Sequence, residues 1–357
     1  MAYSYCHGGD IETFVSEFGT QPIDLSANIN PFGVPEAVRA AMHRAVDECA
    51  HYPDPFCRAA RQAVAEAEGI PADMVYCGNG AADLIYAYCT ALRPRTAVEL
   101  APTFVEYGAG LTQVGCRVER YFLHQAQNFD LDERFLSFLE EKKPEVVFLC
   151  TPNNPTGRLI PLPLLEQILQ YCAAQGARLF LDECFLDLTE DGVSAKSLLA
   201  AHPALLILKA FTKSYGMAGI RLGYCLCADN ALLHDMAAAS PPWNVSSPAQ
   251  SAGVAALAER DFLQRTLSLV RTERRWLTDN LTALGFWVCP SHANYLLFRG
   301  PLGLREGLLQ QGIAIRGCGN YSGLGDGWYR IAVRPHGENE ALITAIRQFC
   351  KEKALWQ

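Results

Sequence analysis

The sequence predicts an α/β fold with two domains. The large domain has three layers and a mainly parallel sheet, and the smaller domain is of the α+β type. Two observations lead to this prediction. From about Met74 onward, short strand-like runs alternate with stretches of helical period. Polar motifs follow several of these runs, and ligands of such sheets gather at the carboxyl ends of the strands.

The strands expected in the large domain are mostly apolar along their whole length, which is typical of strands that helices cover on both faces. Helical periodicity separates them, most clearly over residues 81–92 and 162–174. The expected strands are Met74–Cys77, Ala97–Leu100, Val146–Cys150, Leu179–Asp182, Leu205–Leu208 and Leu222–Cys227.

A long helical region is expected over residues 247–284, after a loop that carries Pro241 and Pro242. Beyond it, strands and helices mix in the manner of a smaller α+β unit. We therefore expect a large domain over residues 50–284 and a small domain formed by residues 1–49 plus 285–357. The expected elements of its second part are strands at 286–288, 295–298, 313–315 and 329–333, and helices at 302–310 and 339–351.

Composition narrows the possible partners. The formal net charge of −8 argues against nucleic-acid binding through a general basic face. The most apolar stretch, residues 198–211, is interrupted by polar residues and a proline, so we expect no membrane span. The first ten residues lack the basic start and apolar run of a signal peptide. Fourteen cysteines without a C-x-x-C pair indicate reduced core thiols in the cytoplasm rather than a disulfide framework or a metal site.

The most informative motif lies at residues 211–223, between two expected strands. Lys213 has the hydroxyl neighbours Thr212 and Ser214 and is followed eight residues later by Arg221. A lysine amine can form a Schiff base with a carbonyl cofactor, and hydroxyl and guanidinium groups are suitable donors to a phosphate. An ordinary surface lysine is the alternative for this motif taken alone.

Three further motifs follow expected strands. Asp182 ends one of them, where an acid can pair with a pyridinium nitrogen or merely cap a helix. Residues 151–157, TPNNPTG, form a turn that directs asparagine amides, including Asn154, toward the cleft. Residues 78–82, GNGAA, precede a helix, whose N-terminus favours an anion. A dinucleotide fingerprint would need glycine at position 83, where the chain has Asp83.

Together and in this order, these motifs resemble those of the fold-type I pyridoxal 5′-phosphate enzymes, the aspartate aminotransferase superfamily, over nearly the whole chain. The resemblance implies the transferase-like architecture of that superfamily, with Lys213 bonded to the cofactor, Asp182 paired with its ring nitrogen and Asn154 bonded to its ring oxygen. Tyr52 matches the residue that reaches the neighbouring subunit's cofactor, so a homodimer is implied. The remaining implied cofactor contacts are Gly80, Ala81, Ala82, Thr212 and Arg221 at the phosphate, and Phe104, or less directly Tyr107, on the ring.

Within the superfamily, two groups compete: the threonine-phosphate decarboxylases of cobalamin biosynthesis and the histidinol-phosphate aminotransferases. The segments 7–10, 25–31, 315–324 and 329–334 look like the decarboxylase group. By this resemblance Arg330 and Asn154 would contact the substrate, with Arg330 on its α-carboxylate. His7, Arg316 and Arg334 would form a cationic pocket for a substrate phosphate, although solvated strand ends are the alternative for the two arginines.

Two positions depart from the usual pattern. Ala210 stands where a hydroxyl residue usually donates to the cofactor phosphate, and Phe185 stands where many aminotransferases have a tyrosine. The phenylalanine is compatible with the decarboxylase group. We therefore expect decarboxylation of L-threonine O-3-phosphate to (R)-1-aminopropan-2-yl phosphate, with an aminotransferase of the histidinol-phosphate type as the alternative. Serine phosphate, which lacks one methyl group, is not distinguished by the sequence. Intact Lys213 and Asp182 argue against a non-catalytic binding protein.

Overall fold

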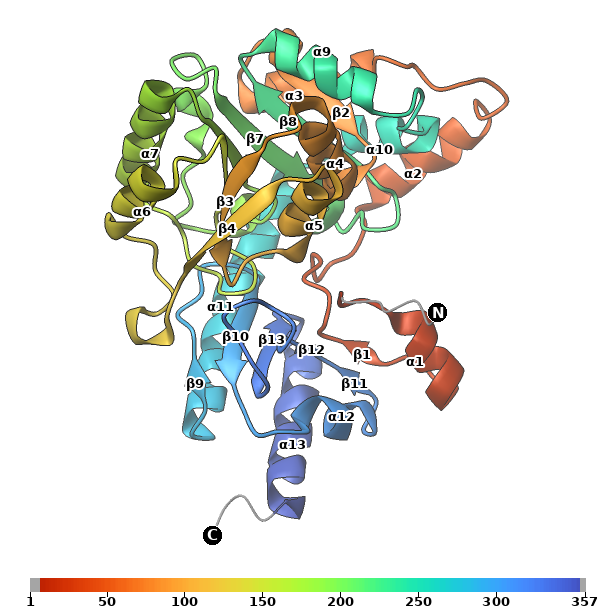
Figure 1. Ribbon diagram of the computed structural model, residues 1–357. Helices are drawn as coiled ribbons and strands as arrows, with labels where there is room; N and C mark the ends of the chain where they lie inside the picture. Colours follow the sequence, from red (N-terminus) through yellow and green to blue (C-terminus); the bar gives the residue numbers. More distant parts are fainter. Residues whose placement is uncertain (1–6, 354–357) are drawn as a thin grey trace.

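The computed structural model describes residues 7–353. Residues 1–6 and 354–357 lie outside the described part. They include most of the ten-residue segment in which no signal peptide is expected, and both ends of the expected small domain. The described chain has two parts, seen in the upper and lower halves of Figure 1. Their arrangement agrees with the expected α/β architecture, whereas the boundaries near residues 49 and 284 stay a prediction.

A seven-stranded sheet occupies the centre of the upper part (Figure 1), in the order β2-β8-β7-β6-β5-β3-β4. Only β8 runs antiparallel to its neighbours; the other adjacent strands are parallel. This confirms the mainly parallel sheet. The strands are β2 (Val75–Gly78), β3 (Thr96–Ala101), β4 (Arg117–Phe122), β5 (Val146–Cys150), β6 (Arg178–Asp182), β7 (Leu205–Ala210) and β8 (Gly223–Cys227).

Helices cover both faces of this sheet and complete three layers. Side chains of β5 alternate between the faces: Val147 and Leu149 join one core, and Val146 and Phe148 join the other. The first core includes residues of α3 (Arg58–Glu68), α6 (Arg134–Lys142), α7 (Leu162–Gln175) and α10 (Ser247–Ala258). The second includes residues of α4 (Gly80–Leu92), α5 (Val105–Gln113) and α9 (Asn230–Ala239). No helix in the described chain is long and apolar enough to cross a membrane.

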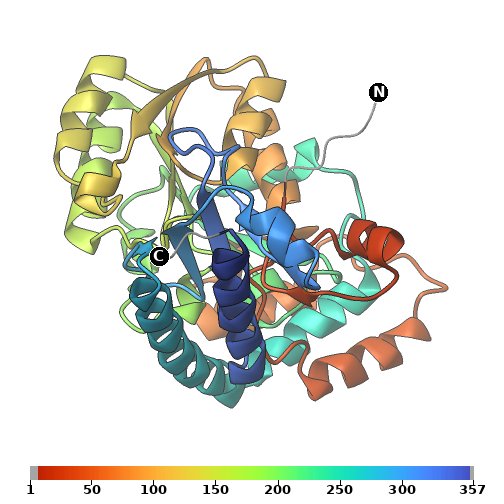
Figure 2. The ribbon, with the colours of Figure 1, turned by 90° about the horizontal axis from the view of Figure 1, so that it is seen from below.

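The lower part has its own sheets and its own core. An antiparallel sheet has the order β12-β13-β10-β9, and β1 pairs with β11 beside it. Seen from below in Figure 2, α11 and α13 lie side by side against this region. The elements of the lower part are α1 (Ile11–Phe18), β1 (Ile23–Asp24), α11 (Arg260–Ala283), β9 (Trp287–Val288), β10 (Tyr295–Arg299), α12 (Leu304–Leu309), β11 (Ile313–Ala314), β12 (Arg316–Gly317), β13 (Trp328–Ala332) and α13 (His336–Glu352). Helix α2 (Glu36–Val46) packs on α10 in the upper part.

The long helical region expected over residues 247–284 is two helices. Helix α10 begins after Ser246, whose hydroxyl accepts a hydrogen bond from the Ala249 N–H. It ends at Ala258; the C-cap Glu259, with φ −84° and ψ 60°, leaves the helical range, and α11 starts at the next residue. The expected helical region is therefore confirmed, with a break at Glu259 that the sequence did not predict.

Candidate active site

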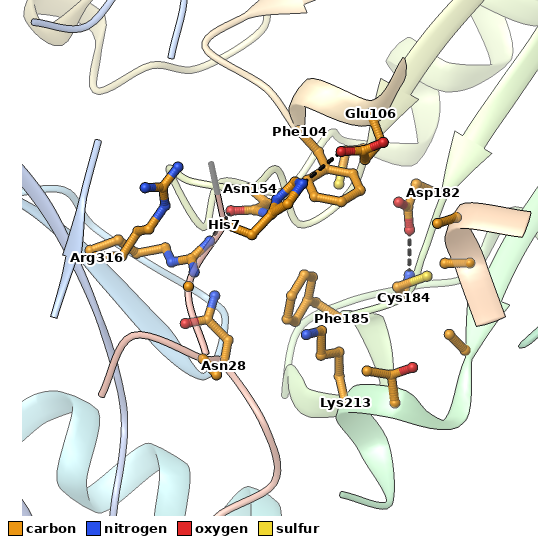
Figure 3. A pocket seen from close by; sticks show the side chains of 18 of the residues that line it. His7, Asn28, Phe104, Glu106, Asn154, Asp182, Cys184, Phe185, Lys213 and Arg316 are labelled. Carbon is orange, nitrogen blue, oxygen red and sulfur yellow. Dashed lines mark hydrogen bonds and ion pairs between the residues drawn. The ribbon is translucent and has the colours of Figure 1, made fainter. Parts of the chain in front are cut away.

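The strands β5, β6 and β7 deliver three of the predicted motifs to one cavity of about 410 Å³. Asn154, Asp182 and Lys213 line it from the upper part, and Arg316 and Arg330 line it from the lower part. Figure 3 shows Asp182 and Arg316 on opposite sides of this space. Segments from distant parts of the sequence therefore build one site at the carboxyl ends of parallel strands.

The short helix α8 (Phe211–Ser214) follows β7 and presents Lys213 to the cavity. Its backbone is held in place by Asn30, whose N–H donates to Lys213 O at 3.0 Å and whose Nδ2 donates to Ser214 O at 2.8 Å. Lys213 Nζ lies 5.7 Å from the centroid of the Phe185 ring. Burial, with the nearby guanidinium of Arg330, lowers the pKa of Lys213 to about 8.

A buried ionic network supports this turn from the opposite side. Lys209, on β7, contacts the carboxylates of Glu68 at 2.7 Å and Asp187 at 2.8 Å. Ser214, next to the active-site lysine, donates its hydroxyl to Asp187 at 3.1 Å, and Tyr224 donates to Glu68 at 2.7 Å. Burial would raise the pKa of Glu68, but Lys209 and Tyr224 lower it to about 2. The network thus ties α3 to the turn that carries Lys213.

The lowered pKa of Lys213 leads to a pH prediction. In the cofactor-free folded chain, acetylation of Lys213 by acetic anhydride should increase as pH rises through about 8, because only the neutral amine reacts. In the urea-unfolded chain the same lysine should follow its ordinary value of 10.5. Peptide mass spectrometry after brief labelling measures both profiles. A midpoint near 10.5 in the folded chain would contradict the geometry described for the amine.

Asp182, the last residue of β6, is buried, and a hydrogen bond to each carboxylate oxygen fixes the orientation of its side chain. Its Oδ1 accepts from the Cys184 N–H at 2.8 Å, and its Oδ2 accepts from the Tyr107 hydroxyl at 2.6 Å. Burial raises the pKa of Asp182, and these two hydrogen bonds oppose that effect. Tyr107 thus contacts the carboxylate, while Phe104 lines the cavity at 79° to the Tyr107 ring.

The start of α4 forms one end of the cavity and suits an anion. Ala81 and Ala82 line it in the first turn of the helix, where N–H groups have no partner within the helix. Gly80 has φ +81°, and a Cβ there would lie 2.6 Å from Arg221 Nη2. Only glycine therefore allows Arg221 to approach the helix start so closely. Thr212 and Arg221 line the same cavity, so the predicted phosphate ligands converge.

Arg330 enters from β13 with part of its hydrogen-bonding capacity unused. Its Nη1 donates to Asn154 Oδ1 at 2.5 Å and its Nη2 donates to Ser26 O at 2.9 Å. Its Nε is buried and has no hydrogen-bond partner in the described chain. The side-chain amide of Asn28, which also lines the cavity, is buried and unpartnered at both polar atoms. Such orphaned groups fit a site that a polar ligand completes.

The cations predicted to bind a substrate phosphate separate into two groups. His7 and Arg316 line the cavity; Arg316 Nη2 donates to Asn320 at 2.8 Å. Arg334 does not line it, because Glu338, four residues later, holds its guanidinium at 2.9 Å. The structure therefore does not support the expectation that Arg334 belongs to the same pocket.

Tyr52 also lies outside the cavity of its own chain. Its side chain is 79% exposed and stacks on Trp243, with ring centroids 4.6 Å apart. A residue so exposed is available to a second subunit, whereas it has no contact with the site that the same chain builds.

The residues of this cavity fit pyridoxal 5′-phosphate. The α4 N-terminus, Thr212 and Arg221 suit its phosphate, Asp182 suits a protonated ring nitrogen, and Lys213 suits its carbonyl carbon. Ala210 is buried at the cavity wall and supplies no side-chain donor, so the phosphate would be held by the α4 start, Thr212 and Arg221. Among residues 7–353, no group of three His, Cys, Asp or Glu side chains could hold a metal ion.

Comparisons with known proteins point to one family. Residues 20–349 match the family described as aminotransferase class I and II. The chain is 36% identical to a threonine-phosphate decarboxylase of Salmonella typhimurium, over 97% of this chain and 96% of that protein. It is 31% identical to histidinol-phosphate aminotransferase 1 of Cupriavidus pinatubonensis, over 97% and 94% of the two chains.

Solved structures show the same fold. The histidinol-phosphate aminotransferase of Clostridium acetobutylicum superimposes with a TM-score of 0.86 at 26% identity, covering 92% of this chain and 99% of that one. The predicted superfamily and its cofactor are therefore confirmed. The chain belongs to the aminotransferase class I and II family and is a pyridoxal 5′-phosphate-dependent enzyme of that superfamily.

Proposed function

We propose that the chain decarboxylates an O-phosphorylated amino acid, L-threonine O-3-phosphate, to (R)-1-aminopropan-2-yl phosphate and carbon dioxide, the side-chain reaction of cobalamin biosynthesis. The observation that carries the proposal is a set of three cationic or potentially cationic side chains in one cavity, Arg330, Arg316 and His7, in addition to Lys213 and Arg221, which suit the cofactor. They enter from separate segments, so the cavity can receive two anionic groups on one small molecule.

The two anionic groups are both present on threonine phosphate. It has a carboxylate, for which Arg330 has an unused buried Nε, and a phosphate, which suits the side of the cavity lined by His7 and Arg316. Histidinol phosphate has a phosphate but no carboxylate, although 2-oxoglutarate, the amino acceptor of the competing reaction, has one. The 36% identity to a threonine-phosphate decarboxylase supports the same choice. Similarity to histidinol-phosphate aminotransferases keeps amino transfer as the competing reaction.

Each cavity residue has a task in this reaction. Bound pyridoxal 5′-phosphate supplies an electron-withdrawing ring that stabilises negative charge at Cα of the attached amino acid. Asp182 holds a proton at the ring nitrogen, and Arg330 binds the substrate carboxylate. His7 and Arg316 hold the far phosphate, so that remote binding energy selects which bond at Cα breaks. When carbon dioxide leaves, the bonding pair stays at Cα, and Lys213 delivers the proton that replaces the carboxylate.

The reaction type is tested with the purified holoenzyme and no 2-oxo acid. We expect one carbon dioxide and one phosphorylated amine for each threonine phosphate consumed, with serine phosphate assayed in parallel. Amino transfer from histidinol phosphate to 2-oxoglutarate, with no carbon dioxide released from either phospho-amino acid, would establish the aminotransferase instead.

Removing the Arg316 side chain should selectively impair turnover of the phosphorylated substrate. Arg316→Ala is expected to lower kcat/KM for threonine phosphate roughly 10- to 100-fold, because a charge-assisted contact to the phosphate is lost. Turnover of unphosphorylated threonine should stay within about 3-fold of the value for the unsubstituted enzyme, because threonine has no phosphate for Arg316 to contact. Steady-state kinetics with both substrates measures the difference. Arg134→Ala, at an exposed surface pair with Asp132, is the matched control.

We also propose that the working unit is a homodimer to which Tyr52 contributes across the interface. Large apolar side chains are exposed in the segments around α2 and α10, as expected of a protein–protein interface. They are Phe32, Val46, Tyr52, Phe56, Trp243 and Val254.

We further propose that the protein works in a reducing, cytoplasmic compartment. The described cysteines are free thiols, which fits this location.

A shared site predicts complementation between two defective chains. Refolding an equimolar mixture of Lys213→Ala and Tyr52→Phe chains should yield hybrid dimers in which one site carries neither change. Activity of the mixture should therefore exceed the mean of the two variants refolded alone. Additive activity, or a monomer at micromolar concentration in sedimentation experiments, would refute the shared site.

A further inference from the structure

His7 lies between two parts of the molecule. After it, Gly8 approaches Ser26 so closely that a Cβ would lie 2.3 Å from Ser26 O. The next N–H, of Gly9, donates to Ser26 Oγ at 2.8 Å, and that hydroxyl donates to Asp24 at 2.6 Å. The segment that carries His7 is therefore anchored to Ser26, which follows β1 and itself borders the cavity.

On the other side, the His7 ring meets a carboxylate from the large sheet's helices. Glu106, in the first turn of α5, has its Oε1 2.7 Å from His7 Nε2 (Figure 3). Its Oε2 accepts a hydrogen bond from the Tyr86 hydroxyl, on α4, at 2.9 Å. Both carboxylate oxygens are thus engaged, and the carboxylate has a defined direction. The His7 ring also lies 5.8 Å from the Phe104 ring.

The ionisation of Glu106 decides the hydrogen-bond direction. The hydrogen bond from His7 lowers the pKa of Glu106, with a smaller contribution from Tyr86, so the side chain is a carboxylate at neutral pH. A carboxylate only accepts hydrogen bonds, so His7 Nε2 must carry the hydrogen. The carboxylate therefore fixes the place of the ring and makes Nε2 a donor toward Glu106.

We propose that Glu106, supported by Tyr86, is a positioning residue for recognition of the substrate phosphate, because it holds the His7 imidazole at the cavity by accepting a hydrogen bond from Nε2. Nε2 is then occupied, so Nδ1 faces the phosphate and donates to it when the ring carries both hydrogens. The proposal rests on the proposed function, in which the His7 and Arg316 side of the cavity receives the phosphate. Glu106 acts through His7 and has no bond-making task. Glu106 lies two residues after Phe104, where its side chain both lines the cavity and contacts His7 of the N-terminal segment.

Kinetics with three variants test the positioning role. Glu106→Ala should raise KM for threonine phosphate roughly 10-fold, with kcat and the turnover of unphosphorylated threonine within about 3-fold, because a charged hydrogen bond to His7 is lost. Glu106→Gln keeps an acceptor oxygen and should recover most of the loss. Tyr86→Phe should show a smaller increase. Glu338→Ala, which removes a similar carboxylate from Arg334 outside the cavity, is the control.

A double-variant cycle separates positioning from a general structural effect. In a His7→Ala background, Glu106→Ala should cause no further increase in KM, because its only route to the phosphate is absent. Equal losses in both backgrounds, or equal losses with phosphorylated and unphosphorylated threonine, would overturn the proposal.

A measurement without substrate keeps this inference distinct from the proposed function. In holoenzyme with ¹⁵N-labelled histidine, His7 Nε2 should show the chemical shift of a hydrogen-bearing nitrogen, assigned by its loss in His7→Ala. Glu106→Ala should change that signal and Glu106→Gln should preserve it. An unchanged signal in Glu106→Ala overturns the positioning role whatever the substrate. A changed signal in an enzyme that releases no carbon dioxide from phospho-amino acids overturns the proposed function alone.

Discussion

Replacing Lys213 with alanine is expected to abolish turnover and the covalent attachment of the cofactor. The side chain enters the cavity from α8, and burial lowers its pKa to about 8, so a reactive neutral amine is accessible near neutral pH. Loss of both nucleophile and proton carrier should reduce kcat by at least about 10⁴-fold. Decarboxylation kinetics measures the loss, and borohydride reduction followed by peptide mass spectrometry locates the attachment.

The matched control is Lys351→Ala, which removes an exposed lysine from the end of α13. That variant should keep the activity and the labelled Lys213 peptide. If borohydride reduction of the unsubstituted chain labels a peptide other than residues 211–223, or if Lys213→Ala still turns over substrate, the assignment of the attachment site is wrong. Circular dichroism distinguishes an inactive folded chain from an unfolded one.

Strands of the large sheet were predictable where burial alone determines them. β5 lies between two neighbouring strands and under helices on both faces, so all five of its residues are apolar and its predicted bounds match the structure. β4 was not predicted, because its sequence RVERYF mixes charged and apolar residues. It lies at the sheet edge and pairs with β3, where Arg120 contacts Glu99 at 2.8 Å. Such a strand is specified by its partner.

The break between α10 and α11 illustrates the same limit. The residues around Glu259 include no proline or glycine, so local sequence carries no stop signal there. The chain nevertheless changes direction at this residue. We attribute the missed boundary to tertiary packing, since α10 lies on α2 and α3 in the upper part while α11 contacts α13 in the lower part.

Much of the cavity was predictable because its motifs follow neighbouring parallel strands, whose carboxyl ends lie at one edge of a sheet. The partners of individual side chains were harder to predict. Arg334 and Glu338 are four residues apart, a spacing typical of ion pairs, which was a signal that the arginine has a partner other than the substrate. Glu106 and Tyr107 lie two and three residues after Phe104, but only the fold shows that they reach His7 and Asp182.

Replacing Asp182 with asparagine is the second change expected to have a very large effect. The substitution keeps the size of the side chain and an oxygen for the Cys184 N–H, but it removes the negative charge opposite a cationic ring nitrogen. In a fully buried position this charge is weakly screened. We therefore expect kcat to fall by roughly 10³-fold or more, equivalent to about 4 kcal/mol, while the cofactor content by absorbance is retained.

Two comparisons determine whether the effect belongs to the charge. Tyr107→Phe keeps the Asp182 carboxylate and removes one hydrogen bond to it, so its loss should be about 10-fold at most. Asp229→Asn changes another acid just after a strand, one that caps α9 by accepting from the Ala231 and Leu232 N–H groups, and it should affect stability without affecting kcat. Near-normal turnover of Asp182→Asn, or an effect no larger than that of Asp229→Asn, would show that Asp182 has only a structural, cap-like role. A loss far exceeding both comparison variants, with cofactor still bound, is the result expected if Asp182 holds the ring nitrogen protonated.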